Sequence, residues 1–243
     1  MGWYDFSSVG INKTSIMNLL ILLGLSIAPG IAIALYIYFR DKYEKEPLRF
    51  LIITFFLGIL SVIPTLFFEL ALGKNYNFGT ENLFDMLVYN FIVIGFTEEF
   101  FKAAPLIFYA YPKKDFNEPF DGITYSIMTA MGFATIENIF YVINGGWQVA
   151  LLRLFTAVPA HATFAILVGY FVGLSKFKKY SVSYITMGII SATIFHGAYD
   201  FFLSIQKYPL IIFGAVASLV VGIFLSFKAM KNLSECSPFK ILK

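Results

Sequence analysis

The chain has 243 residues, of which 58% are hydrophobic and only 14% charged, and its mean hydropathy is +0.75. Soluble domains average about a quarter charged residues, so this composition excludes an ordinary soluble globular protein and indicates a chain covered by lipid. The net charge of +3 is too small and too dispersed for a nucleic-acid-binding surface, and the single cysteine, Cys236, excludes a disulfide or a cysteine-ligated metal centre within one chain.

Apolar runs long enough to cross a bilayer follow one another along the chain, since a span needs about 20 predominantly apolar residues. The first run is too long for a signal peptide and follows no basic segment, so we expect a retained anchor. The connections are short, which predicts one transmembrane domain over residues 1–243: an all-α polytopic membrane helix bundle of about seven transmembrane helices. The expected spans are 17–39, 49–72, 84–111, 120–143, 150–174, 181–204 and 208–230.

Lysine and arginine are distributed unevenly over the loops. The loops after the first, third and fifth expected spans and the C-terminal tail carry most of them, whereas the alternate loops carry only Lys13, Lys74, Arg153 and Lys207. Positive loops face the cytoplasm, so we expect a plasma-membrane protein with its N-terminus outside and its C-terminus in the cytoplasm.

Several ionisable residues fall inside the expected spans. A charge in the bilayer core costs at least about 2.5–3.5 kcal/mol, so such residues are functional candidates by default. Both histidines of the chain belong to this set. Its members are Glu98, Glu99 and Lys102 in the third span, Glu137 in the fourth, His161 in the fifth, and His196 and Asp200 in the sixth.

Helical geometry relates these residues to one another. At about 1.5 Å of rise per residue, Glu98, Glu137, His161 and His196 fall in one layer of the outer half of the membrane, which predicts a shared polar cavity open to the outside. Glu98 and Lys102 share a helix face and can pair, whereas Glu99 points about 100° away from Glu98.

The sixth span repeats the same four-residue spacing with His196 and Asp200. Asp200 can therefore accept a hydrogen bond from the His196 ring and fix its tautomer. Pro159, two residues before His161, is expected to kink the fifth span.

Structural roles compete with catalytic ones for each residue. Glu98 and Lys102 could be an ion pair that pins two helices, Glu137 an interhelical hydrogen-bonding group, and Asp200 a solvated residue near the interface. Two histidines at matching depth beside two acids favour a catalytic role over a structural one.

Two chemistries use such a set. In one, a glutamate takes a proton from water and the histidines stabilise an oxyanion. In the other, His161, His196 and Glu98 ligate zinc and another glutamate is the base. Both amount to amide hydrolysis within the membrane, and the spacing leaves open whether zinc or no cofactor is used.

Taken together, the motifs resemble the PrsW family of intramembrane proteases. They are Glu-Glu-x-x-Lys at 98–102, the stretch 132–138 with Glu137, His161, His-x-x-x-Asp at 196–200, and the loop 40–47. The resemblance implies that Glu98 or Glu99 activates water, that His161 and His196 complete the site with Glu137, and that Lys102 and Asp200 support it. It further implies a single-span membrane protein as substrate, such as an anti-sigma factor, cut on the extracytoplasmic side.

Related families leave alternatives open. CAAX prenyl proteases belong to the same clan, but they often have Asn where this chain has Asp200, and they would need a cytoplasmic opening that the loop charges disfavour. A scaffold subunit of gamma-secretase belongs there too, so a non-catalytic scaffold remains a hypothesis. A proton- or ion-coupled transporter is another, although no inverted repeat is visible.

Overall fold

The computed structural model describes residues 13–74, 82–205 and 212–242, which form helices joined by short loops, with no strand among them. The all-α prediction is therefore confirmed. In chain order the helices are α1 (Lys13–Arg40), α2 (Leu48–Gly73), α3 (Leu83–Val88), η2 (Tyr89–Phe96), α4 (Thr97–Pro105), η3 (Leu106–Ala110), α5 (Asp121–Phe155), α6 (Ala157–Phe177), α7 (Ser181–Ser204), α8 (Ile212–Glu235) and η5 (Pro238–Leu242).

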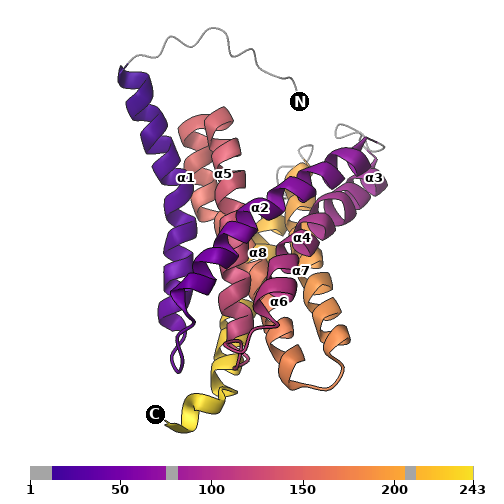
Figure 1. Cartoon of the computed structure of the whole chain (residues 1–243). Coiled ribbons are helices and arrows are strands. Elements are labelled where there is room, and N and C mark those ends of the chain that lie inside the picture. The colour runs from indigo at the N-terminus through magenta and orange to yellow at the C-terminus, as the bar shows by residue number, and fades with distance from the viewer. Residues whose placement is uncertain (1–12, 75–81, 206–211, 243) are drawn as a thin grey trace.

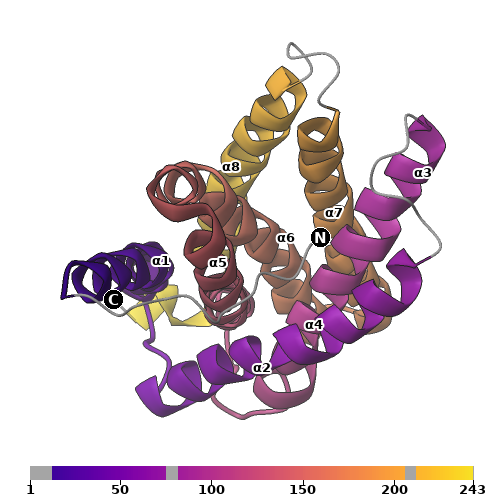
Figure 2. The same ribbon diagram turned by 90° about the horizontal axis from the view of Figure 1, so that it is seen from above.

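Helices α5 and α6 form the centre of the bundle (Figure 2). Helix α5 packs against α1, α2 and α6, and α6 packs against α5, α7 and α8. Small residues permit this close packing: a Cβ on Gly122 of α5 would lie 2.3 Å from the carbonyl oxygen of Gly169 in α6. Van der Waals contact of this kind holds helices together where lipid leaves little hydrophobic driving force.

Helix α5 reverses direction at Gly146, so that its two arms lie side by side (Figure 1). Gly146 has φ 66° and ψ −155°, a conformation that a side chain strongly disfavours. The break between the expected spans 120–143 and 150–174 falls at this turn. The descending arm then leads into α6.

The third expected span is a composite of α3, η2, α4 and η3. Segments η2 and η3 have the wider π-helical turn, which often occurs at functional sites. Segment η2 approaches α7 closely, because a Cβ on Gly95 would lie 3.2 Å from the backbone nitrogen of Gly197. This approach brings the following helix, α4, beside the middle of α7.

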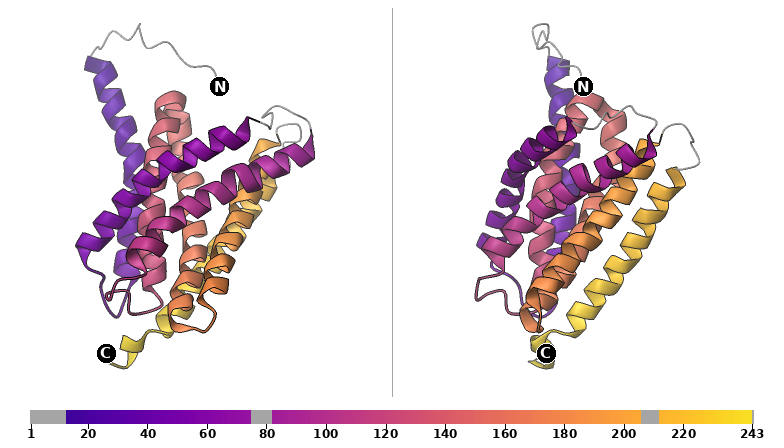
Figure 3. Two further views of the ribbon diagram at one scale, coloured as in Figure 1. Left: turned by 45° about the vertical axis from the view of Figure 1, so that its right-hand side comes forward. Right: turned by 90° about the vertical axis from the view of Figure 1, so that its right-hand side faces the viewer.

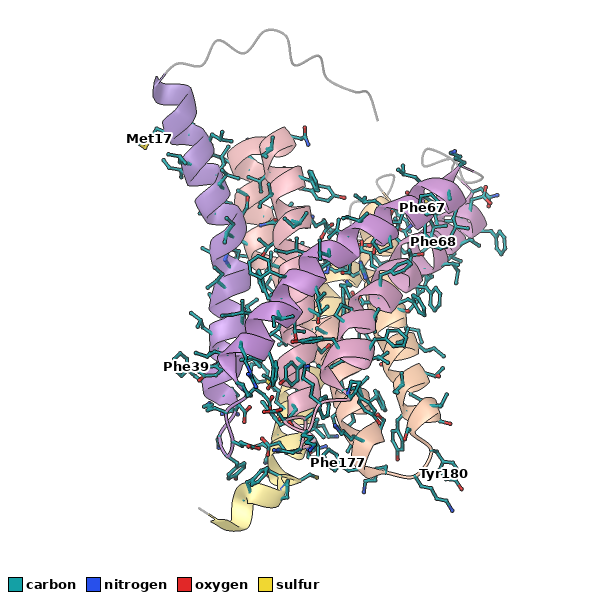
Figure 4. All side chains as sticks on the ribbon, viewed as in Figure 1. Met17, Phe39, Phe67, Phe68, Phe177 and Tyr180 are labelled. Carbon is teal, nitrogen blue, oxygen red and sulfur yellow. The ribbon has the colours of Figure 1, made fainter. Side chains whose placement is uncertain are left out.

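Large apolar side chains cover the outside of the bundle, as Met17, Phe39, Phe67 and Phe68 illustrate (Figure 4). Such a surface suits lipid and not water. Among the described residues, four helical stretches could cross a membrane by length and composition: Met17–Arg40, Leu48–Gly73, Asp121–Phe177 and Ile212–Glu235. The protein is therefore a helical membrane protein, while the count of seven spans stays a prediction.

The basic loops share one end of the bundle. The loops that follow α1, η3 and α6 lie at the end where the C-terminal segment lies, opposite the end where the two arms of α5 meet (Figures 1 and 3). We call this the loop end. The side of the membrane that it faces stays a prediction.

A candidate active site among helices α4 to α7

Helix α4 turns its polar side chains inward and its aromatic ones outward. Glu98, Glu99 and Lys102 are buried, whereas Phe96, just before α4, and Phe100 are largely exposed. This polarity is the reverse of a helix on a soluble protein, because here lipid covers the outside. The charged residues of α4 must therefore find partners within the bundle.

The ammonium group of Lys102 is the hub of the site. Its Nζ lies 2.5 Å from Oε1 of Glu99, 3.2 Å from Oε2 of Glu98 and 3.2 Å from Nδ1 of His161. An ammonium has three hydrogens to donate, so these contacts use all of them. Lys102 also lies 4.9 Å from the ring centroid of Phe133. Glu99 contacts His196, as a side chain turned about 100° from Glu98 can, but it also pairs with Lys102 three residues on, which the expected geometry had reserved for Glu98.

His196 is held between carboxylates on two helices. Its Nδ1 lies 2.9 Å from Glu99 Oε1, and its Nε2 lies 3.1 Å from Asp200 Oδ2 and 3.8 Å from Glu98 Oε2. The ring stacks on Phe164, with centroids 4.9 Å apart. Because both ring nitrogens face carboxylates, this arrangement suits a ring that donates from both of them.

His161 has a defined tautomer in this arrangement. The Lys102 ammonium can only donate, so Nδ1 of His161 accepts. The hydrogen is then on Nε2, which lies 2.7 Å from Oε2 of Glu137. Pro159 introduces no kink before His161, because α6 begins at Ala157 and proline is tolerated in the first turn of a helix.

Arg153 joins the site, although its sequence position indicated an outer loop; that interpretation is wrong. Its Nη2 lies 3.0 Å from Glu137 Oε2, and its Nε donates to Oδ1 of Asn138 at 2.8 Å. Asn138 in turn donates to the carbonyl of Ser26 in α1 at 3.0 Å. The signal for this pairing is Gly146, which lies about midway between residues 137 and 153 and permits the hairpin.

The structure thus joins every site residue expected from the sequence in one network, with the histidine ring centroids 5.6 Å apart. Carboxylates, imidazoles and an ammonium from four helices meet in the interior of the bundle. Such a cluster can activate water and stabilise a developing negative charge. Its members are Glu98, Glu99, Lys102, Glu137, His161, His196 and Asp200.

The donor set has the chemistry of a catalytic zinc site, namely two imidazoles and a carboxylate. The position between Glu98 and Nδ1 of His161 is filled by a positive charge of the chain itself, the Lys102 ammonium. Within the described residues, however, His161, His196 and Glu98 do not form a group whose ligand atoms all lie within 4.8 Å. A metal at this position would therefore replace the Lys102 ammonium.

Comparison with known proteins gives a consistent result. Residues 46–227 match the model of a family described as PrsW family intramembrane metalloprotease. Protease PrsW of Bacillus subtilis (strain 168) is 36% identical over 75% of this chain and 83% of its own. Protease PrsW of Clostridioides difficile (strain 630) is 37% identical over 75% of this chain and 79% of its own. No solved structure matches the chain significantly.

Proposed function

This chain belongs to the PrsW family of intramembrane metalloproteases, and from that premise we propose that it cuts a membrane-anchored protein on the extracytoplasmic side, using water activated by Glu98. The observation that carries the proposal is the convergence of Glu98, Glu99 and Lys102 with His161 and His196 in one buried network. Peptidase activity follows from the family, while the roles below are our assignment.

Glu98 suits the role of general base better than Glu99. Glu99 is held at one oxygen by both Lys102 and His196, so it is an orienting residue. Glu98 makes longer contacts, 3.2 Å to Lys102 and 3.8 Å to His196, and is therefore freer to take a proton from water. A base of this kind must lie within about 2.6–3.2 Å of the proton donor in the reacting complex.

We assign stabilisation of the negative charge on the peptide oxygen to His196 and Lys102. His196 is fixed by Glu99 and Asp200, and its Nε2 faces Glu98. Either cationic group could donate to the oxyanion that forms when water adds to the peptide carbonyl, in exchange for one of its present contacts. His196 can then protonate the leaving amine. Glu137 fixes the His161 ring, whose Nδ1 holds the Lys102 ammonium in position.

The residue types of the site match those of a catalytic metal site, although the ligand atoms of His161, His196 and Glu98 do not come together in the structure. His161, His196 and Glu98 would hold a resident metal, with zinc the ion that such ligands prefer. When bound, it supplies Lewis-acid polarisation and a more acidic water. Glu98 would then be a ligand, so another glutamate would have to act as the base. Lys102 and one carboxylate partner of His196 would have to give way to the metal.

The position of the site along α5 supports extracytoplasmic cleavage. Glu137 lies about 24 Å along the helix from Asp121 at the loop end, and only about 14 Å from the turn at Gly146. If the basic loop end faces the cytoplasm, the site lies in the outer half of the membrane. A single-span protein, such as an anti-sigma factor, could present a bond there.

The test is cleavage of a single-span substrate by full-length protein in liposomes. We expect Glu98→Gln to lower kcat by about 10²–10⁴, as for loss of a general base. Glu98→Asp keeps the charge beside Lys102 but withdraws the carboxylate, so it should fold and still be impaired. Glu235→Gln, an exposed residue at the loop end, is the matched control. Wild-type rates in Glu98→Asp and Glu98→Gln would exclude Glu98 as base, and no cleavage by folded wild type would favour a scaffold.

A further inference from the structure

A second group of buried carboxylates lies at the loop end, apart from the candidate active site. Asp41 follows α1, Glu118 lies in the loop before α5, and Asp121 is the first residue of α5. One carboxylate oxygen from each lies within 4.8 Å of the others, and the three residues are at most 2% exposed. About 24 Å of helix separates Asp121 from Glu137, so the two clusters do not share ligands.

Only one of the two carboxylate oxygens of Asp121 hydrogen-bonds to the local backbone. Oδ2 accepts hydrogen bonds from the backbone N–H groups of Asn117, at 2.7 Å, and Glu118, at 2.8 Å. Oδ1 is buried and accepts none from the described residues. A buried oxygen without a donor is costly, and no side chain among the described residues donates to this one.

Asp41 provides an independent indication of a missing positive group. Within the described part of the chain, neither of its buried oxygens accepts a hydrogen bond. Its neighbour is the carboxyl group of Glu118, which cannot donate while ionised. Lys45 lies near the Asp41 carboxylate and favours its charged form, but its ammonium hydrogen-bonds to the backbone carbonyls of Tyr38 and Asp41 and not to the carboxylate.

The surrounding residues tie this cluster to several segments. Ser237, beyond α8, donates to Glu118, and Tyr125 of α5 donates to Glu46 in the first loop. The cluster is therefore the place where the first loop, the start of α5 and the C-terminal segment meet. A ligand bound there would fix all of them at once.

We infer that Asp41, Glu118 and Asp121 bind a divalent cation that prefers oxygen ligands, such as Mg²⁺ or Ca²⁺, which clips the loop end of the bundle together. Carboxylate oxygens are the ligands that these ions prefer, whereas zinc and copper sites favour imidazole or thiolate. Calcium binds oxygen at about 2.3–2.6 Å, so ligands on opposite sides of one ion lie up to about 5 Å apart, which agrees with the spacing here. Cation binding also offsets the repulsion among the buried carboxylates.

The experiment is thermal unfolding and calorimetric titration of full-length protein in detergent, stripped with chelator and then given Mg²⁺, Ca²⁺ or Mn²⁺ alone. We expect a saturable rise in Tm and direct binding by at least one of these ions. Asp41→Asn and Asp121→Asn should weaken the affinity about tenfold or more. Glu235→Gln should bind as wild type does. His196→Ala should also retain the effect, which separates this site from the candidate active site.

The behaviour in chelator distinguishes a cation site from a merely structural carboxyl. Without cation, Asp41→Asn should be at least as stable as wild type, because the amide removes a buried charge. With cation, wild type should be the more stable. A saturable shift of equal size in Asp41→Asn and wild type would overturn the inference. So would a wild type that binds none of the three ions, the result expected if the carboxyls only share protons.

Discussion

The two buried polar clusters differ in how their charges are balanced. In the candidate active site, Lys102 and Arg153 contact carboxylates directly, and each histidine faces at least one acid. At the loop end, Asp41 and Asp121 make no ion pair within the described residues, and three of their four carboxylate oxygens accept no hydrogen bond. The charges of the first cluster are therefore nearly balanced by its own members, whereas Asp41 and Asp121 in the second find no cationic partner among the described residues.

This difference has consequences for mutation. Removing one member of a balanced buried network leaves its partners as uncompensated charges, which is strongly destabilising. Removing a member of an overcharged cluster relieves repulsion and costs little unless a cation is bound. The predictions below test this contrast, starting with the change that should have the largest effect.

The largest effect should come from Lys102→Met, which removes the hub of the balanced cluster. Glu98, Glu99 and Nδ1 of His161 would lose their shared donor, and we expect a loss of about 3–5 kcal/mol in the free energy of unfolding together with loss of cleavage. Unfolding in mixed detergent–denaturant micelles measures the first, and the liposome assay the second. Lys231→Met, an exposed lysine of α8, is the control. Equal stability of the two variants would show that the cluster does not need its ammonium.

Partial rescue separates charge balance from catalysis in the same cluster. Adding Glu99→Gln to Lys102→Met removes a carboxylate that has lost its ammonium partner, and should recover part of the lost stability. Activity should stay lost, because Lys102 and the orientation of His196 by Glu99 are both missing. Recovery of activity in the double variant would contradict the role assigned to Glu99.

A smaller effect should follow from Arg153→Gln, which acts through two intermediate side chains. Arg153 contacts Glu137, and Glu137 contacts His161, so the loss should misorient the ring without removing it. We expect kcat to fall about 10–100-fold, the usual effect of removing a supporting partner, with little change in KM. Arg153→Lys keeps a charge near Glu137 and should recover part of kcat. An unchanged kcat in Arg153→Gln would show that the contact between Arg153 and Glu137 contributes only to the structure and not to catalysis.

These residues also show how far the sequence could lead. The helical fold, the helices carrying the acids and histidines, and the His196–Asp200 spacing could be predicted, because helical periodicity and hydropathy are local properties. Arg153 could not be placed by loop counting, since its partner depends on a reversal at Gly146 that brings distant residues together. The Asp41 cluster was missed entirely, because its members lie in loops and at a helix start, where acidic residues are common and hydropathy carries no signal.

Gly146→Ala tests whether the balanced cluster depends on that reversal. An added Cβ would meet nothing within 4 Å, so any effect must come from the backbone at φ 66°. We expect a loss of about 1–2 kcal/mol in unfolding free energy. The matched control is Gly24→Ala. A Cβ there also meets nothing within 4 Å, but the backbone is helical, so the variant should unfold with the same free energy as wild type or up to about 1 kcal/mol more. The cation response of the loop end should not change in either variant.

The smallest effect concerns hydroxyl groups on α5, where two fully buried threonines have different partners. Thr129 donates to the carbonyl of Tyr125 at 3.1 Å, whereas the hydroxyl of Thr124 has no hydrogen-bond partner within the described residues. Thr129→Val should lose about 0.5–1.5 kcal/mol, while Thr124→Val should be neutral or slightly stabilising, because it removes a polar atom that is already unpaired. Helix and substitution are shared, so the difference between the two unfolding free energies isolates the hydrogen bond. If Thr124→Val proved the more damaging, the Thr124 hydroxyl would have to have a hydrogen-bond partner in the membrane-embedded protein. The buried polar atoms near the loop end would then be better paired than the contrast between the two clusters requires.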